Sequence, residues 1–288
     1  MDIGLHLMNF SLDEGDSAIR RTVLDGARAV EDAGFDRLTV MDHWFQMEHF
    51  APPTEPMLEA YTTLGFVAAA TARLDLGVLV TGVTYRYPAL LAKTVTTLDV
   101  LSGGRAIFGI GAAWYEREHL GLGVPYPALK ERFARLEEAI LIAKQMWSDD
   151  NSPFDGEFSH LAETISRPQP VRGSIPILIG GGGEQKTLKL VARYADAANL
   201  LASDPETVGH KIDVLRRHCD DVGRDFADIQ LTIVTNGDPS DDPDAFVESM
   251  RAYAALGVTQ AQVRNPTSGI VEWAAGLGRT VVPRLAEF

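Results

Sequence analysis

An acid and a base stand side by side where an apolar run of the chain ends. Residues 38–41 precede Asp42 and His43, and the aromatic Trp44 follows them. Histidine titrates near neutral pH, so it can donate or accept a proton, and a neighbouring carboxylate can orient it. The alternative is an aspartate that caps a loop beside a half-exposed histidine, and spacing alone favours neither interpretation. We take His43 as the candidate catalytic residue.

Two glycine-rich segments follow other apolar runs. Residues 109–115 read Gly-Ile-Gly-Ala-Ala-Trp-Tyr, and such small residues allow a flat ring to approach the backbone, although they also pack barrel interiors. Gly180–Gly183 lead into a predicted helix, where free backbone N–H groups and the helix dipole favour an anion. This second loop predicts a phosphate site. It lacks the lysine and hydroxyl pair of a P-loop, so nucleoside triphosphates are disfavoured.

Other polar residues give weaker signals. His6 lies inside the first predicted strand, and a hydrogen-bonded core histidine is favoured over one that faces a ligand. Arg86 precedes a proline that starts a helix, and a structural role is favoured over contact with an anion. Asp42, His43 and His49 are close in sequence, but further ligands at other strand ends are sparse, so no metal site is expected.

A repeated strand-then-helix pattern must position these residues. Short apolar runs alternate with amphipathic segments about eight times. The strands are expected at residues 2–9, 36–41, 74–81, 105–111, 176–180, 196–201, 229–235 and 258–263. Eight such units predict an α/β fold of the (β/α)8 TIM-barrel type, with its active site at the carboxyl ends of the strands. A Rossmann sheet is disfavoured because no GxGxxG follows the first strand.

Two connections are longer than a plain barrel needs. Residues 42–56 follow the second strand, and residues 148–174 lie between the fourth helix and the fifth strand. Such insertions usually shape the mouth of an active site or a subunit contact. Within the second insertion, residues 154–158 can form a small hairpin. No linker divides the chain, so we expect residues 1–288 to form one domain.

Composition excludes several classes of function. The chain is 45% hydrophobic and 23% charged, which is typical of a globular protein with a large core. Its net charge of −14 disfavours binding to nucleic acid or to an anionic membrane surface. The sequence shows neither a leader nor a run near the ~20 apolar residues of a membrane span, so we expect a cytoplasmic protein. The single cysteine, Cys219, falls on the apolar stripe of a predicted helix and is expected in the core.

Taken together, these segments resemble the luciferase-like monooxygenase superfamily, specifically its branch of oxidoreductases that use the deazaflavin coenzyme F420. The resemblance runs through essentially the whole chain. It is carried by residues 3–7, 33–36, 41–43, 81–88, 98–105 and 109–118. It implies a barrel that holds a flavin-like ring against a bulge in the third strand, where a non-proline cis peptide joins Leu79 and Val80. It also implies a homodimer.

The resemblance also implies roles for individual residues. The expected cofactor-binding residues are Asp42, Leu79, Val80, Thr81, Ala112 and Ala113 around the ring, with Gly181 and Gly182 at the phosphate. The expected substrate-pocket residues are His6, Trp44 and Trp114. Sugar-phosphate dehydrogenases of this branch carry an acidic residue at the position of Trp114, which disfavours a sugar-phosphate substrate and leaves the proton-transfer partner of His43 unidentified. The aromatic residues indicate an apolar or aromatic substrate.

The chemistry implied is hydride transfer between F420 and a C=C, C=N or C=O bond of a small organic substrate, in either direction. His43 would supply or take the proton, and Asp42 would orient the histidine or the ring. The alternative is a monooxygenase that uses flavin mononucleotide (FMN) and a separate reductase. A barrel that only binds a ligand and a metal-dependent hydrolase are more distant possibilities. The sequence does not reveal a basic groove for the acidic tail of F420.

Overall fold

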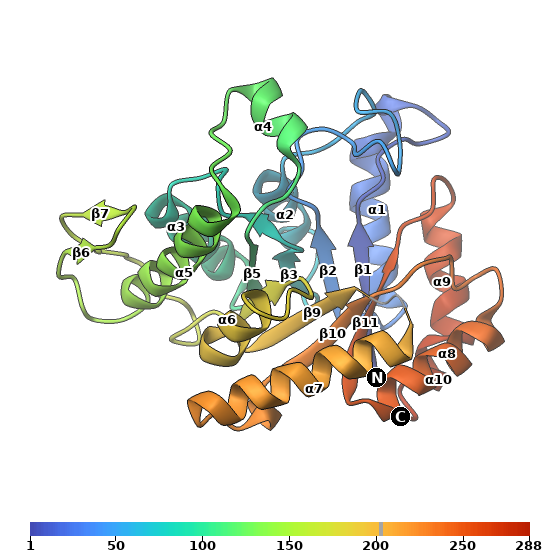
Figure 1. The fold of residues 1–288 in the computed structure, drawn as a ribbon. Helices are drawn as coiled ribbons and strands as arrows, with labels where there is room; N and C mark the ends of the chain where they lie inside the picture. The colour runs from blue at the N-terminus through green and yellow to red at the C-terminus, as the bar shows by residue number, and fades with distance from the viewer. Residues whose placement is uncertain (202–203) are drawn as a thin grey trace.

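Parallel strands form a closed barrel in the computed structural model, which describes residues 1–201 and 204–288. The strand order is β3-β2-β1-β11-β10-β9-β8-β5-β4, and pairing of β3 with β5 closes the ring. The barrel strands are β1 (Asp2–Leu7), β2 (Arg37–Val40), β3 (Asp75–Val78), β4 (Thr81–Gly82), β5 (Ala106–Gly111), β8 (Ile177–Gly180), β9 (Ala197–Leu201), β10 (Gln230–Val234) and β11 (Val258–Arg264). The predicted (β/α)8 barrel is therefore confirmed, with helices outside the strands (Figure 1).

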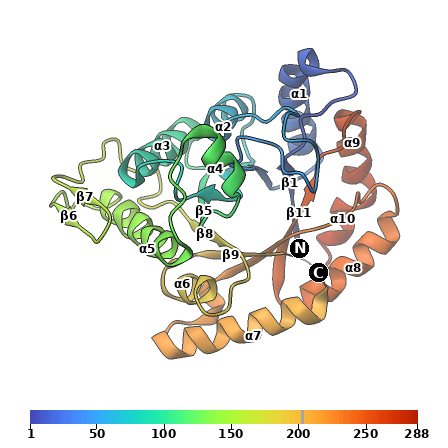
Figure 2. The same cartoon turned by 45° about the horizontal axis from the view of Figure 1, so that its top comes forward.

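Helices follow the strands around the outside of the barrel, as Figure 2 shows. The helices are α1 (Ile19–Asp32), α2 (Ala60–Ala68), α3 (Pro88–Ser102), α4 (Glu116–Leu122), α5 (Leu129–Met146), α6 (Thr187–Tyr194), α7 (Pro205–Val222), α8 (Pro243–Ala255), α9 (Ile270–Thr280) and α10 (Val282–Leu285). Short 3-10 turns, η1 (Asp16–Ala18) and η2 (Phe226–Asp228), precede α1 and β10. Local sequence sets several boundaries. Asp242 accepts the N–H of Ala245 at the start of α8, and Gly103 ends α3 in the left-handed conformation.

The third strand position is interrupted, although the sequence predicts one strand over residues 74–81. β3 ends at Val78 and β4 begins at Thr81. The peptide bond between Leu79 and Val80 is cis, as the family resemblance predicts. These two residues leave the sheet and project into the mouth of the barrel.

Both long connections are present. The loop between β2 and α2 covers residues 41–59 and lies over the carboxyl ends of the strands. The second contains the antiparallel pair β6 (Phe154–Asp155) and β7 (His160–Leu161), so the expected small hairpin forms. That hairpin lies beside α5, away from the centre of the barrel mouth (Figure 2).

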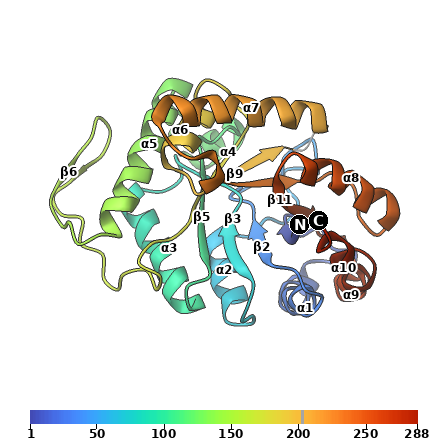
Figure 3. The same cartoon turned by 90° about the horizontal axis from the view of Figure 1, so that it is seen from below.

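The apolar core lies mainly between the strands and the helices. Cys219 is fully buried there, as expected. The two termini meet at the amino-terminal end of the barrel, where the Met1 amine donates to the Leu285 carbonyl at 2.7 Å (Figure 3). None of the helices in the described part of the chain is long and apolar enough to cross a membrane. A single domain over residues 1–288 stays a prediction.

Candidate active site

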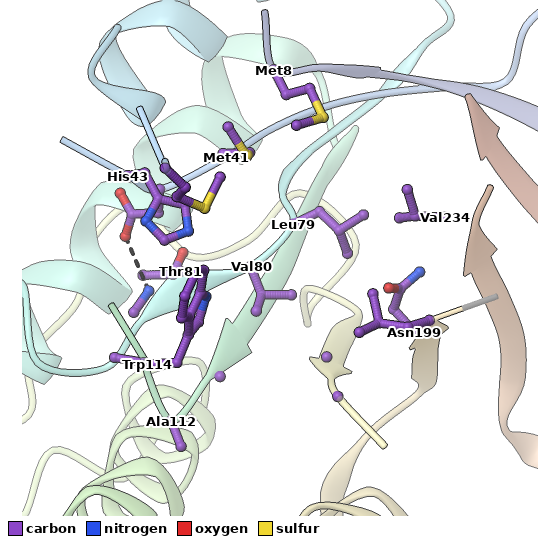
Figure 4. Close-up of a pocket in the computed structure, with 18 of the residues that line it drawn as sticks. Met8, Met41, His43, Leu79, Val80, Thr81, Ala112, Trp114, Asn199 and Val234 are labelled. Atoms are coloured by element: carbon purple, nitrogen blue, oxygen red, sulfur yellow. Dashed lines mark hydrogen bonds between the residues drawn. The ribbon is translucent and has the colours of Figure 1, made fainter. Parts of the chain in front are cut away.

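A cavity of about 670 Å³ opens at the carboxyl ends of the barrel strands (Figure 4). Its lining includes His6 from β1, Met8 directly after β1, Asp42 and His43 after β2, Leu79 to Gly82 at the bulge, Ala112 to Trp114 after β5, Gly180 and Gly181 at β8, Asn199 from β9, Val234 from β10 and Arg264 from β11. Most of the predicted site residues are therefore brought to one place, because the carboxyl ends of parallel barrel strands meet at one face.

His43 is held by a carboxylate that the sequence analysis missed. Its Nδ1 lies 2.7 Å from Glu118 Oε1, and its ring packs edge-on against Trp114 with centroids 5.5 Å apart. A carboxylate only accepts hydrogen bonds, so the Nδ1 of His43 carries the hydrogen in this pair. Nε2 is then the ring nitrogen that can exchange a proton with a ligand in the cavity.

Glu118 is fully buried and accepts several hydrogen bonds. Oε1 accepts from His43 and from the hydroxyl of Tyr85, while Oε2 accepts the backbone N–H of Trp44 at 2.7 Å and of Phe45 at 3.3 Å. Burial by itself would raise the pKa of Glu118, but the hydrogen bonds from His43, Tyr85 and Trp44 outweigh burial and lower it. The carboxylate is therefore ionised at neutral pH and fixes the orientation of His43.

The short helix α4 places Glu118 beneath His43. His119, the next residue, donates from Nδ1 to the Tyr115 carbonyl at 2.8 Å and contacts the Thr84 hydroxyl through Nε2 at 2.6 Å. The ring of Tyr85 stacks on His119, with centroids 4.5 Å apart. These buried contacts anchor α4 to the loop after β4. Glu118 is 75 residues from His43 in the sequence. The sequence also gives no reason to choose Glu118 over Glu116, which is exposed, as the partner of His43.

Asp42 does not orient His43, in contrast to one expectation. Its carboxylate accepts two hydrogen bonds from Arg86, at 2.7 and 3.0 Å, and the N–H of Gly82 at 3.1 Å. Arg86 also pairs with Glu59 at 2.6 Å. The structural interpretation of Arg86 is therefore correct. Asp42 lines the cavity while it ties the end of β2 to the loop after β4.

Glycine on two neighbouring strands makes room for the bulge. A Cβ on Gly111 would lie 2.8 Å from Val80 Cγ2, and a Cβ on Gly180 would lie 2.8 Å from Val80 Cγ1. Any larger residue at these positions would displace Val80. Figure 4 shows Leu79 and Val80 projecting between His43 and Trp114 on one side and Asn199 and Val234 on the other. Ala112 and Ala113 add a small wall, and Ala113 adopts a left-handed φ of 57°.

The glycine loop after β8 forms the other end of the cavity. Gly181, with a φ of +120°, lines it together with Thr187, the first residue of α6. Within the described part of the chain, the N–H groups of Gly182 and Gly183 donate to no protein acceptor. Gly182 is outside the lining but beside it, and a Cβ there would lie 3.7 Å from Lys211 Cε. The loop therefore offers backbone donors and a nearby cation to an anionic group.

The three expected substrate-pocket residues lie in different places. His6 is buried on the floor of the cavity, where its Nδ1 contacts the Thr39 hydroxyl at 2.9 Å. Trp114 lines the mouth and is half exposed. Trp44 is not among the lining residues, because its ring packs edge-on against Tyr85, with centroids 5.9 Å apart, and beneath Arg86.

Histidine and acidic side chains do not gather into a metal site anywhere in the described residues. Thr81 is fully buried and contacts the hydroxyl of Tyr61 at 2.7 Å, so it contributes to the wall behind the bulge. The arrangement combines a mostly apolar cavity, a histidine that can exchange a proton and is backed by a carboxylate, and a loop that can bind an anion. It suits a planar organic cofactor that carries a phosphate.

Comparisons with known proteins find similar sequences over most of the chain. The family model described as luciferase-like monooxygenase matches residues 1–277. The F420-dependent glucose-6-phosphate dehydrogenase of Kineococcus radiotolerans is 33% identical over 247 residues, which cover 83% of this chain and 70% of that protein. The protein of the same name from Mycolicibacterium fortuitum is 32% identical over 250 residues, covering 84% and 72%.

Solved structures share the fold at low sequence identity. An F420-dependent secondary alcohol dehydrogenase, in complex with an F420-acetone adduct, matches with a TM-score of 0.83 and 18% identity, covering 99% of this chain and 98% of that one. The F420-dependent tetrahydromethanopterin reductase of Methanopyrus kandleri matches with a TM-score of 0.80 and 17% identity, covering 98% of each chain.

Proposed function

The chain belongs to the luciferase-like monooxygenase family, and we propose that it is an F420-dependent oxidoreductase that acts on a small organic substrate. The observation that carries the proposal is the cavity itself, in which the Leu79–Val80 bulge, the His43–Glu118 pair and the glycine loop surround one space. Two relatives that are about a third identical to this chain over the aligned residues are named as F420-dependent enzymes, which supports the same cofactor here.

The residues present fit this cofactor. The deazaflavin ring would lie against Leu79 and Val80, where Gly111 and Gly180 give the bulge its room. The phosphate would be held at Gly181 and Gly182, close to Lys211. F420, when bound, supplies or accepts a hydride at the central carbon of its ring. Lys211 and His210, which both contact Glu184, also provide basic groups near the loop for the acidic tail.

His43 would carry the proton. In the reductive direction, the C=C, C=N or C=O bond of the substrate gains a hydride, and Nε2 of His43 donates the proton that completes the product. In the oxidative direction, Nε2 accepts that proton. The ionised Glu118 accepts the hydrogen bond from Nδ1 of His43, so that Nδ1 is turned away from the substrate and Nε2 faces it.

We do not transfer glucose 6-phosphate from the relatives' names to this chain. The family resemblance places Trp114 at the position where the sugar-phosphate dehydrogenases of the branch carry an acidic residue. The ring of Trp114 packs against His43, so no carboxylate is present at this position. Much of the lining around it is apolar, which supports a less polar substrate. Homodimerisation remains a proposal from the family resemblance.

Equilibrium titration tests the proposal. Purified protein is titrated with F420 and, in parallel, with FMN, following the quenching of cofactor fluorescence. We expect F420 to bind at least 10-fold more tightly than FMN. Gly181→Val should weaken F420 binding, whereas Gly276→Val on α9, where an added Cβ meets no atom within 4 Å, should not. A preference for FMN would contradict the proposal and point to oxygenase chemistry, and binding of neither would remove the redox function.

A further inference from the structure

Arg264 is a cation in the cavity that forms no ion pair with a carboxylate in the part of the chain that the structure describes. It ends β11, and within residues 1–201 and 204–288 its guanidinium donates one hydrogen bond, from Nη2 to Asn236 Oδ1 at 3.0 Å. Its Nε is buried without an acceptor. The two other residues of the chain, Ala202 and Ser203, carry no charge. Because a guanidinium presents five N–H donors, most of the donors of Arg264 remain available.

Other cations around the cavity mouth are paired. Arg86 is neutralised by Asp42 and Glu59, and Lys211 by Glu184. Burial lowers the pKa of Arg264, and no nearby carboxylate opposes this effect. A half-buried cation that lacks a counterion is costly unless a ligand supplies one. Arg264 therefore differs from Arg86 and Lys211 in that no carboxylate of the described residues offsets its charge.

An anion bound to Arg264 would lie on the side of the cavity near His43 rather than near the glycine loop. β1 lies between β2, which leads to His43, and β11, which ends in Arg264. Strands two positions apart are separated by roughly 10 Å. His6 on β1 lies between the two groups, and burial together with the charges of Arg264 and His43 lowers its pKa to about 3. The glycine loop for the cofactor phosphate follows β8, three strand positions away from β11.

The surroundings indicate what kind of anion fits. The guanidinium lies over the ring of Phe50, with Cζ 4.9 Å from the ring centroid, and Met8 and Met47 line the cavity nearby. These apolar groups suit a hydrocarbon body rather than a sugar. A guanidinium fork can bind a carboxylate or a phosphate in bidentate geometry. Its single positive charge balances a carboxylate, whereas it leaves one charge of a phosphate dianion without a counterion. Since the protein carries a net charge of −14, a local cation is needed to attract an anion.

We infer that Arg264 binds the carboxylate of an organic acid substrate, whose apolar body lies between Phe50 and Met8 and whose reactive bond reaches His43. The assignment of a reactive bond rests on the proposed function. The carboxylate site itself does not, because binding of an acid can be measured without turnover.

The test compares acids with their uncharged amides. The probes are phenylacetate, 3-phenylpropionate and 5-phenylpentanoate, the three matching amides, and glucose 6-phosphate. Each is titrated calorimetrically into F420-saturated protein and into cofactor-free protein. The variants are Arg264→Met, which keeps the length of the side chain, and Arg264→Gln as a second variant if the first does not fold. Arg20→Met is the matched control, since Arg20 lies over Phe66 on the outside of the barrel.

We expect at least one acid to bind about 10- to 100-fold more tightly than its amide, as a charge-assisted hydrogen bond predicts. Arg264→Met should reduce this preference to less than about twofold, while F420 affinity and the Arg20→Met control stay unchanged. Equal binding of every acid and amide, or a preference that survives in Arg264→Met, would overturn the inference. Tighter binding of glucose 6-phosphate than of any acid would overturn the apolar part of it.

The same titrations separate this inference from the proposed function. If F420 fails to bind but the acids bind through Arg264, the carboxylate site stands and the proposed cofactor is wrong. If Arg264→Met weakens F420 binding and leaves the acids unaffected, Arg264 serves the cofactor and the inference is wrong.

Discussion

Replacing Glu118 by glutamine tests whether this carboxylate orients His43 for proton transfer. Oε2 of Glu118 accepts two backbone N–H groups, from Trp44 and Phe45, so the amide oxygen of the variant must take that place. The NH2 group then faces His43 and Tyr85, where only acceptors suit it. Nδ1 of the neutral His43 ring must then accept a hydrogen bond, so the ring hydrogen moves to Nε2. When the ring is doubly protonated, it no longer has a carboxylate beside it.

The size of the effect follows from that single contact. A hydrogen bond to a charged group contributes about 1.5–3 kcal/mol, and each 1.4 kcal/mol in a barrier changes a rate tenfold. We therefore expect Glu118→Gln to lower kcat by roughly 10- to 100-fold while the Kd for F420 stays within about twofold. Single-turnover bleaching of F420, with the best substrate from a screen of alcohols, enones, imines and organic acids, measures the rate.

A second readout does not depend on the substrate. Nitrogen NMR of the histidine ring should show hydrogen on Nδ1 of His43 in the wild type and on Nε2 in Glu118→Gln. Glu138→Gln is the matched control, because Glu138 is also buried and accepts backbone N–H groups, from Glu157 and Phe158, outside the site. An unchanged kcat together with an unchanged ring signature in Glu118→Gln would refute the role given to Glu118.

Three further predictions concern stability and the cofactor cavity. The pKa of His6 is about 3 in the native state and near 6.5 in the unfolded state, so between about pH 6 and 4 only the unfolded state binds the proton. The free energy of unfolding should therefore fall by about 1.4 kcal/mol for each pH unit of acidification. His6→Gln should flatten this pH dependence in urea unfolding. Gly180→Ala should push Val80 aside, destabilise the fold by about 1–3 kcal/mol and weaken F420 binding, as thermal melts and titration would show. Glu31 accepts the N–H groups of residues 72–74, so Glu31→Gln should cost about 1–3 kcal/mol in chemical denaturation, and an unchanged midpoint would contradict this.

The barrel itself could be predicted from sequence because its strands are short apolar runs bounded by glycine, proline and polar residues. Each observed barrel strand lies within one or two residues of the expected range, apart from the interruption after Val78. Periodicity cannot reveal that interruption, since Leu79 and Val80 continue the apolar run. The cis bond between them was predicted from the family resemblance alone.

The site could be predicted only in part, for a different reason. His43, Thr81, Ala112 and Gly181 follow strands, so the fold class brings them together. Glu118 comes from a short helix that the pattern analysis did not separate from the loop, and its partner is far away in sequence. The direction in which a loop side chain points is set by contacts that sequence spacing does not contain.

Trp44 shows the same limit. It follows His43 directly and is aromatic, which suggested the substrate pocket, yet the backbone N–H of Trp44 is bound by Glu118 and its ring turns toward Tyr85 and Arg86. Arg264 went unnoticed in the sequence because it ends the last strand without any motif around it.

The central claim is that one cavity holds F420 against the Leu79–Val80 bulge with His43 beside the reacting carbon. A crystal structure of the F420 complex tests this most directly. We expect the ring against the bulge, the phosphate at Gly181 and Gly182, and Nε2 of His43 facing the side from which substrate enters. A ring bound elsewhere, or with His43 turned away from it and released from Glu118, would contradict the account.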